Sequence, residues 1–170
     1  LDNASIGVQL LLSKEMSTAR KHAETLDLAN RRRQDIEAAV FRDCCKQIDI
    51  MDELPAALVL YDKSWHPGVV GIVATKIVER YDRPTIIIGE GGRGSGRTAQ
   101  GLHLYDAMNS VREKLMKFGG HRAAAGLTIA PQHIDDFRRD FCRFIETNHA
   151  EGITESLLEF DETLSPEQCS

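Results

Sequence analysis

One helical pattern occupies the first third of the chain, from residue 14 to about residue 50. Apolar residues recur there at spacings of three and four, the period of one helix face; they are Ala19, Ala23, Leu26, Ala29, Ile36, Val40, Cys44 and Ile48. We expect Ser13 to cap this helix, with Glu15 in its first turn. At 1.5 Å per residue the helix would extend about 50 Å, which suits a rod that connects two domains.

Arg33 lies in the gap that this apolar stripe leaves between Ala29 and Ile36, within "ANRRRQ". In one interpretation its stem lies along the helix edge and its charged end reaches water. In the other, the arginine directs a cation into a cleft between two domains. The first gives Arg33 a packing role and the second a binding role.

After Pro55 the pattern changes to alternating strands and helices. We predict strands at 56–61, 84–89 and 124–130, and helices at 68–81, near 104–118 and from 131 to about 149. This alternation predicts an α/β fold with a small mixed β-sheet flanked by helices. The expected organisation is a connecting helix in residues 1–52, a domain in 53–150 and the start of a further segment in 151–170.

Composition excludes several classes of protein. Of the 170 residues, 42% are hydrophobic and 28% are charged, as in a soluble globular protein. Neither a run of about 20 apolar residues nor a secretion signal is present, so we expect a cytoplasmic protein with no membrane partner. The four cysteines have no C-x-x-C spacing, which argues against a zinc site and favours reduced thiols. Because the chain starts without methionine, we expect a piece of a longer protein.

Charge is spread unevenly around a net value of −5. Residues 91–126 carry six basic and two acidic side chains, whereas residues 134–170 carry three basic and ten acidic ones. The glycine-rich centre can therefore hold an anionic ligand, while the C-terminal part is typical of solvated surface.

The glycine-rich segment "GEGGRGSGRTAQG", residues 89–101, follows a predicted buried strand. It approximates G-x-G-x-x-G and the P-loop, but both must open into a helix, and Gly101 would break its first turn. A P-loop-like NTPase fragment is therefore a distant alternative. The segment also fits a loop and edge strand in which Ser95 and Arg97 face the same side and bind one anion. A glycine-rich hairpin with solvated arginines fits it as well.

Two histidines lie beside glycines. In "KFGGHRAAAG", residues 117–126, bare backbone flanks His121 on both sides. This arrangement is typical of a tight turn before a buried strand, or of a site where a ligand approaches the backbone closely. In "SWHPGVVG", residues 64–71, His66 either caps the following helix or lines a site.

Three segments, "SWHPGVVGIVATKIVERYDRPTIII", "GRGSGRT" and "GGHRAAAG", together resemble the DHH-associated domain of RecJ-type single-strand-specific exonucleases across about residues 55–146. The preceding "ETLDLANRRRQDIE" resembles the helix that connects the catalytic DHH domain to this one. The final "LLEFDETLSPEQ" resembles the entry to an OB-fold domain. The glycine–histidine motif alone is shared with DHH phosphodiesterases that act on short oligonucleotides or cyclic dinucleotides, which remain an alternative.

The resemblance implies an enzyme of DNA repair and recombination that degrades single-stranded DNA from its 5′ end. Two divalent ions, Mn²⁺ or Mg²⁺, would be bound by the DHH domain and would activate water. No DHH motif occurs in this sequence, so we expect no cofactor in this chain and no activity of the chain alone. The implied partners are single-stranded DNA, the protein's own DHH and OB-fold domains, a single-strand-binding protein and a helicase.

The resemblance also places a set of residues at the substrate: Arg33, Ser95, Arg97, Gly119, Gly120, His121 and Gly126, with Asn30, His66 and Gly94 as further candidates. His121 would be catalytic, donating a hydrogen bond to the scissile or a neighbouring phosphate. A terminal phosphate carries more charge than an internal diester. Ser95 and Arg97 therefore fit recognition of the 5′ end.

Overall fold

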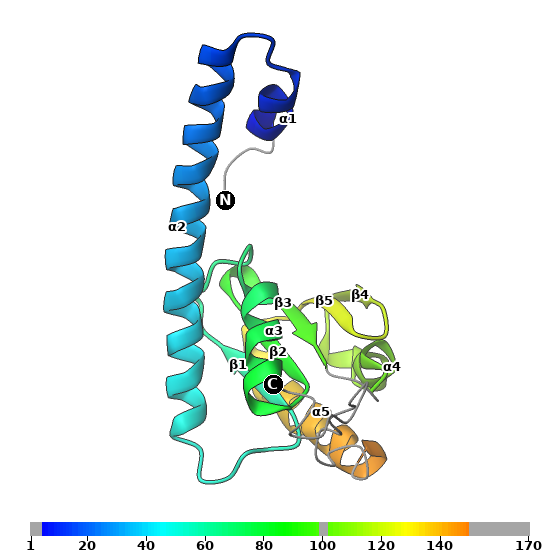
Figure 1. The fold of residues 1–170 in the computed structure, drawn as a ribbon. Coiled ribbons are helices and arrows are strands. Elements are labelled where there is room, and N and C mark those ends of the chain that lie inside the picture. The colour runs from blue at the N-terminus through cyan, green and yellow to red at the C-terminus, as the bar shows by residue number, and fades with distance from the viewer. Residues whose placement is uncertain (1–4, 99–101, 150–170) are drawn as a thin grey trace, which may run out of the picture.

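A computed structural model describes residues 5–98 and 102–149 of the chain. The expected rod is present as α2, Met16–Asp49, a single helix of 34 residues (Figure 1). A short helix that the sequence analysis did not predict, α1, Ser5–Leu12, precedes it and packs against it. The predicted Ser13 cap is wrong, because its hydroxyl donates to the carbonyl of Gln9 in α1 and Glu15 takes the N-cap position.

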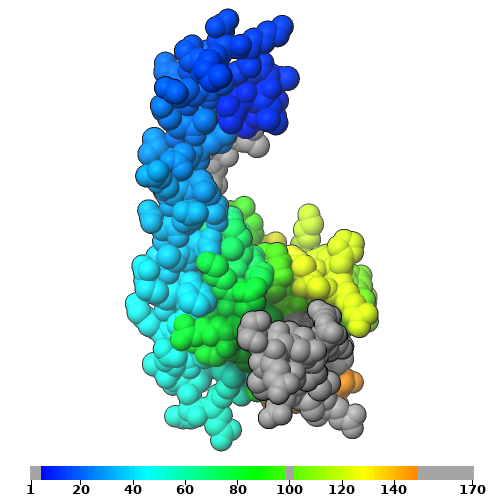
Figure 2. All heavy atoms as spheres, viewed as in Figure 1, coloured from blue at the N-terminus to red at the C-terminus, as the bar shows by residue number. Residues whose placement is uncertain are grey.

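Only the C-terminal half of α2 is anchored in the domain. Its buried residues all lie in that half: Glu37, Val40, Cys44, Cys45 and Ile48. The N-terminal half and α1 stand away from the domain (Figure 2). They expose apolar side chains there, including Leu11, Leu12 and Leu28. The predicted rod is therefore a core helix at one end and a projection at the other.

Five strands form one mixed sheet in the order β1-β2-β3-β5-β4. They are β1 Leu58–Tyr61, β2 Thr85–Ile88, β3 Arg93–Arg97, β4 Lys117–Gly120 and β5 Ala124–Thr128. β1 and β2 are parallel, since α3, Val70–Tyr81, carries the chain back between them, and the other neighbouring pairs are antiparallel. The predicted mixed α/β fold is confirmed. The prediction of an edge strand at Ser95 and Arg97 is wrong, because β5 pairs with the outer side of β3.

Helices pack on both faces of the sheet and form two separate cores. On one face, α2 and α3 bury Leu60 and Ile87 together with Trp65. On the other face, α4, Leu104–Ser110, and α5, Ile134–His149, bury Ile86 and Ile88. Neighbouring residues of β2 thus enter different cores, as the two-residue period of a strand requires.

The helix predicted near 104–118 is shorter than expected. α4 ends at Ser110, a 3-10 turn spans Arg112–Lys114, and the chain then enters β4. The backbone N–H of Met116 donates to the carbonyl of Thr128 at 2.9 Å, so pairing with β5 takes over from helical hydrogen bonds. The last predicted helix likewise starts with a 3-10 turn, Pro131–His133, before α5.

The P-loop-like pattern does not form a P-loop. Its described part consists of a 3-10 turn at Glu90–Gly92 followed directly by β3. A P-loop opens into a helix whose N–H groups hold phosphate, whereas this segment becomes the central strand of the sheet. The NTPase alternative is therefore wrong. Gly101, on which the sequence argument also relied, lies outside the described residues.

Within residues 5–98 and 102–149, no helix combines the length and the apolar character that crossing a bilayer needs.

Candidate functional site

Strand register aligns three of the predicted site residues in one row across the sheet. Ser95 on β3 pairs with Gly126 on β5, and Gly126 pairs with Gly119 on β4. Directly paired residues of neighbouring strands point to the same face. The row therefore carries one hydroxyl followed by two positions without side chains.

A second row lies beside the first. Arg97 pairs with Ala124, whose carbonyl accepts a hydrogen bond from the backbone N–H of His121 at 2.8 Å. His121 thus follows the end of β4 at the far end of this row, in the turn between β4 and β5. His121 is exposed to solvent.

The half of this face that β4 and β5 form is open among the described residues. α3 lies over β2 and β3 (Figure 1). A Cβ built on Gly119 or Gly126 would meet no atom within 4 Å. Arg93 and Lys117, both exposed, share this face through their common partner Thr128. The open face therefore combines bare backbone with cations, which suits an anionic chain.

Two other glycines among the predicted site residues, Gly94 and Gly120, are required by packing within the sheet. A Cβ on Gly120 would lie 2.4 Å from the carbonyl oxygen of Ala124. A Cβ on Gly94, which points to the opposite face, would lie 2.9 Å from the carbonyl oxygen of Ile87. Close packing of neighbouring strands therefore accounts for both glycines, and Gly94 does not join the rows described above.

The side chains of Ser95 and Arg97 meet α3 at Gly71. A Cβ at position 71 would lie 3.1 Å from a terminal guanidinium nitrogen of Arg97 and 3.4 Å from the hydroxyl of Ser95. The prediction that the two side chains share one side is confirmed. Gly71 belongs to the first turn of α3, the end of a helix that favours negative charge.

A cavity of about 580 Å³ lies between Arg97 and the turn after β4. Ala123 and Ala124 line its side toward that turn, and Glu79 and Asp82 line its side toward α3. His121 is not among the residues that line this cavity.

His66 has a structural contact. Its Nδ1 accepts a hydrogen bond from the backbone N–H of Gly68 at 2.9 Å, in the turn that leads into α3. The N-cap residue of α3 is Val69 and has no side-chain cap, so His66 does not cap the helix and instead closes the turn that precedes it.

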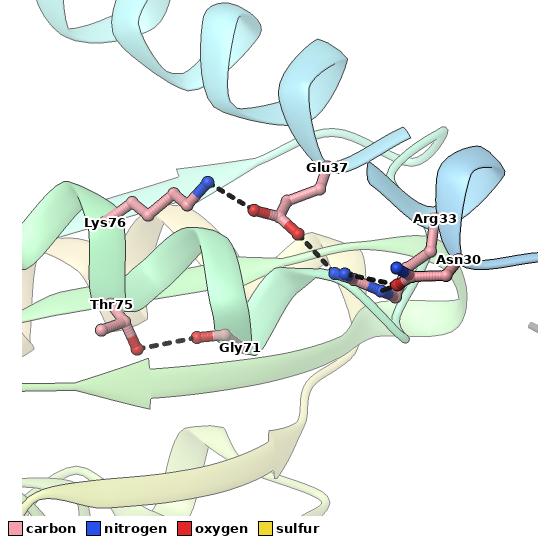
Figure 3. A network of polar contacts seen from close by, with 6 residues as sticks. All are labelled: Asn30, Arg33, Glu37, Gly71, Thr75 and Lys76. Atoms are coloured by element: carbon pink, nitrogen blue, oxygen red, sulfur yellow. Dashed lines mark hydrogen bonds and ion pairs between the residues drawn. The ribbon is translucent and has the colours of Figure 1, made fainter. Parts of the chain in front are cut away.

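Arg33 and Asn30 lie together on α2, beside α3 (Figure 3). Oδ1 of Asn30 accepts hydrogen bonds from Nε and a terminal nitrogen of Arg33, at 3.2 and 2.9 Å. The other terminal nitrogen donates to Glu37 at 2.5 Å. The second carboxylate oxygen of Glu37 pairs with Lys76 of α3, also at 2.5 Å.

The pKa of Glu37 is lowered. The hydrogen bond from Lys76 is the largest cause, and the charges of Lys76 and Arg33 add to it, while burial acts in the opposite direction. Sequence reasoning missed both Glu37 and Lys76. The spacing of four residues between Arg33 and Glu37 was a usable signal for a helical ion pair, but the contact to Lys76 depends on how α2 and α3 pack.

Among the residues that the structure describes, His, Cys, Asp and Glu side chains form no cluster of three or more that could hold a metal ion.

A protein-family model for the DHHA1 domain matches residues 55–147, more than half of the chain. The chain belongs to the DHHA1 domain family. The sheet and its open face lie inside the DHHA1 domain, whereas Asn30 and Arg33 belong to the preceding α2. The fold and the extent of the match agree with the resemblance found in the sequence.

The DHHA1 domain and α2 are similar to parts of larger proteins. The chain is 38% identical over 169 residues to the single-stranded-DNA-specific exonuclease RecJ of Haemophilus influenzae, covering 90% of the chain and 29% of that protein. It is 37% identical over 171 residues to RecJ of Escherichia coli, with coverages of 94% and 29%. The chain thus spans about 29% of the length of these relatives.

Solved structures give the same result. The crystal structure of RecJ in complex with Mg²⁺ from Thermus thermophilus matches with a TM-score of 0.79 and 30% identity, over 85% of this chain and 23% of that one. The crystal structure of an exonuclease RecJ bound to manganese matches with a TM-score of 0.76 and 31% identity, over 84% and 36%. The relatives and structures named above are RecJ proteins.

Proposed function

We propose that this chain is the substrate-binding part of a 5′-to-3′ single-stranded-DNA exonuclease of DNA repair and recombination. One observation carries the proposal: Ser95, Arg97 and His121 border an open sheet face whose centre, at Gly119 and Gly126, has no side chains. A DNA backbone can approach such a surface closely. The similarity to RecJ proteins supplies the class of substrate.

Arg97 and Ser95 are the proposed site for the 5′ phosphate. A guanidinium offers a fork of donors that matches phosphate oxygens, and the hydroxyl adds a further donor. The two groups lie against the first turn of α3, at Gly71, where negative charge is favoured. A doubly charged terminal phosphate gains more from this site than an internal diester does.

His121 is the proposed contact to the phosphate at which cleavage occurs. Two strand spacings, about 10 Å, separate the backbones of Arg97 and His121, so the two side chains suit different phosphates of one strand. The exposed imidazole can donate a hydrogen bond as negative charge develops on a phosphoryl oxygen. Arg33 would add a cation from α2.

The hydrolytic centre is proposed to lie in a DHH domain outside this chain. When bound there, two Mn²⁺ or Mg²⁺ ions would activate the attacking water. We expect that domain to pack on α1 and the projecting half of α2, where Leu11, Leu12 and Leu28 are exposed. The remaining proposed partners are the protein's OB-fold domain, a single-strand-binding protein and a helicase.

Binding of labelled oligonucleotides to this chain tests the proposal. Fluorescence anisotropy should show tightest binding to 5′-phosphorylated single strands, weaker binding to 5′-hydroxyl strands and the weakest to blunt duplex. Affinity should fall as salt rises, because phosphate contacts release counterions. Equal affinity for all three ligands would overturn the proposal. Incubation with Mn²⁺ should leave every strand intact unless the DHH domain is present.

A further inference from the structure

Glu37 is the one acidic side chain that is buried within residues 5–98 and 102–149, with a residue exposure of 6%. Burying a carboxylate is costly unless cations and hydrogen bonds compensate it. Both oxygens of Glu37 are compensated, one by Arg33 of the same helix and one by Lys76 of α3 (Figure 3). The Glu37 carboxylate therefore belongs to a buried ion cluster with Arg33 and Lys76, and not to the solvated face of the helix.

The cluster fixes the guanidinium of Arg33. Asn30 accepts from Nε and one terminal nitrogen, and Glu37 accepts from the other terminal nitrogen. A guanidinium has five N–H groups, so three are engaged and two are left for a ligand. The Arg33 side chain is still 29% exposed. Its orientation is thus set before any ligand arrives.

We propose that Glu37 is a positioning residue, which holds the guanidinium of Arg33 in the orientation that meets a phosphate of the bound strand. This inference rests on the proposed function, in which Arg33 contacts DNA. A side chain that is already ordered loses less conformational freedom on binding. Glu37 itself is shielded from the phosphate, because cations cap both of its oxygens.

The direction in which Glu37→Gln changes the affinity for DNA shows whether Glu37 positions Arg33. Glu37→Gln removes one negative charge at nearly constant shape, and by Coulomb attraction alone it should strengthen binding to DNA. If Glu37 acts by holding Arg33, the same change should weaken binding. Asp35→Asn is the matched control, since Asp35 is an exposed acid on the same helix.

The experiment measures the affinity of this chain for a 5′-phosphorylated single-stranded oligonucleotide, with thermal denaturation of each variant. We expect Arg33→Ala to weaken binding about tenfold and Glu37→Gln about threefold to fivefold. The double variant should bind like Arg33→Ala alone. Asp35→Asn should bind as tightly as the wild type or more tightly. Arg33→Ala should also show a salt dependence whose slope is lower by about 0.7, the value for one lost phosphate contact on a single strand, and Glu37→Gln a smaller decrease.

Asn30→Ala provides a second route to the same conclusion, because it removes the other acceptor of the guanidinium at an exposed position. Its loss of affinity should also disappear in the Arg33→Ala background. The inference is overturned if Glu37→Gln binds as the wild type does, or if its loss persists without Arg33. If Arg33→Ala itself binds normally, the role of Arg33 in the proposed function is wrong, and the inference is wrong with it.

Discussion

Gly71 and Arg97 touch across the contact between α3 and β3: a Cβ at position 71 would lie 3.1 Å from a terminal guanidinium nitrogen. The neighbour that would have to move is the far end of a flexible side chain. A substitution at Gly71 can therefore shift the guanidinium while the backbone stays in place.

Gly71→Ala should separate stability from phosphate binding. Alanine is favoured over glycine inside a helix by about 1 kcal/mol, so the melting temperature should hold or rise. The displaced guanidinium should lower the preference for 5′-phosphorylated over 5′-hydroxyl strands. Gly7→Ala in α1 is the control, because its Cβ would meet nothing within 4 Å. A preserved preference in Gly71→Ala would show that the position of Arg97 does not matter.

Arg97 and His121 should have different effects in the exonuclease that joins this chain to a DHH domain. Arg97→Ala should erase the preference for a 5′ phosphate, a loss of about 1–3 kcal/mol for a charge-assisted contact. Arg97→Lys should restore it only in part, since an ammonium cannot replace a bidentate fork. His121→Ala should slow both substrates alike. The measurement compares cleavage rates on 5′-phosphorylated and 5′-hydroxyl strands of the same sequence. If Arg97→Ala slows both equally, Arg97 binds phosphates in general and does not recognise the 5′ end.

Alanine at two glycines of the sheet should give opposite results. At Gly126 the added Cβ points into open space, so unfolding free energy should hold while DNA affinity falls. At Gly94 it would lie 2.9 Å from the carbonyl of Ile87, and overpacking should destabilise the domain by about 1–3 kcal/mol. Urea denaturation and anisotropy distinguish the two. If Gly126→Ala binds DNA normally, the bound DNA does not lie over Gly126.

Glu37 should make stability depend on pH in the acidic range. Its pKa is lowered, chiefly by the hydrogen bond from Lys76. A carboxyl of this kind stabilises the fold above its unfolded pKa, about 4.3, and the contribution is lost as pH falls through the folded pKa. In urea titrations, Glu37→Gln should lose less stability than the wild type below about pH 4.3; parallel curves would contradict this.

The sequence predicted the elements whose patterns are local. The apolar periodicity predicted α3, and an unbroken apolar run predicted β2. The two-residue period of a strand predicted that the side chains of Ser95 and Arg97 point to the same side. Pairing between distant segments could not be derived in this way. The helix predicted near 104–118 overlaps the first two residues of β4, and only the ladder with β5 reveals the strand.

The ion cluster at Glu37 was missed for the same reason. Helical spacing relates Arg33 to Glu37, but the approach of Lys76 depends on the packing of α3 against α2. The central position of β3 was also missed, since "RGSGR" has the polar, glycine-rich composition of an exposed loop. Its glycines are required because the neighbouring core leaves no space for a Cβ at Gly94 and Gly96.

Because α2 is anchored at one end only, a small rotation at that end produces a large displacement at the other. Its buried residues begin at Glu37, and the turns from Met16 to Arg33 extend outward by about 27 Å at 1.5 Å per residue. A rotation of 10° about the anchored end would move the far end by roughly 5 Å over that length. The ion pair between Glu37 and Lys76 lies where the anchored part of α2 begins. A small bend of α2 just before Glu37 would therefore change the distance between the open sheet face and any domain carried on α1.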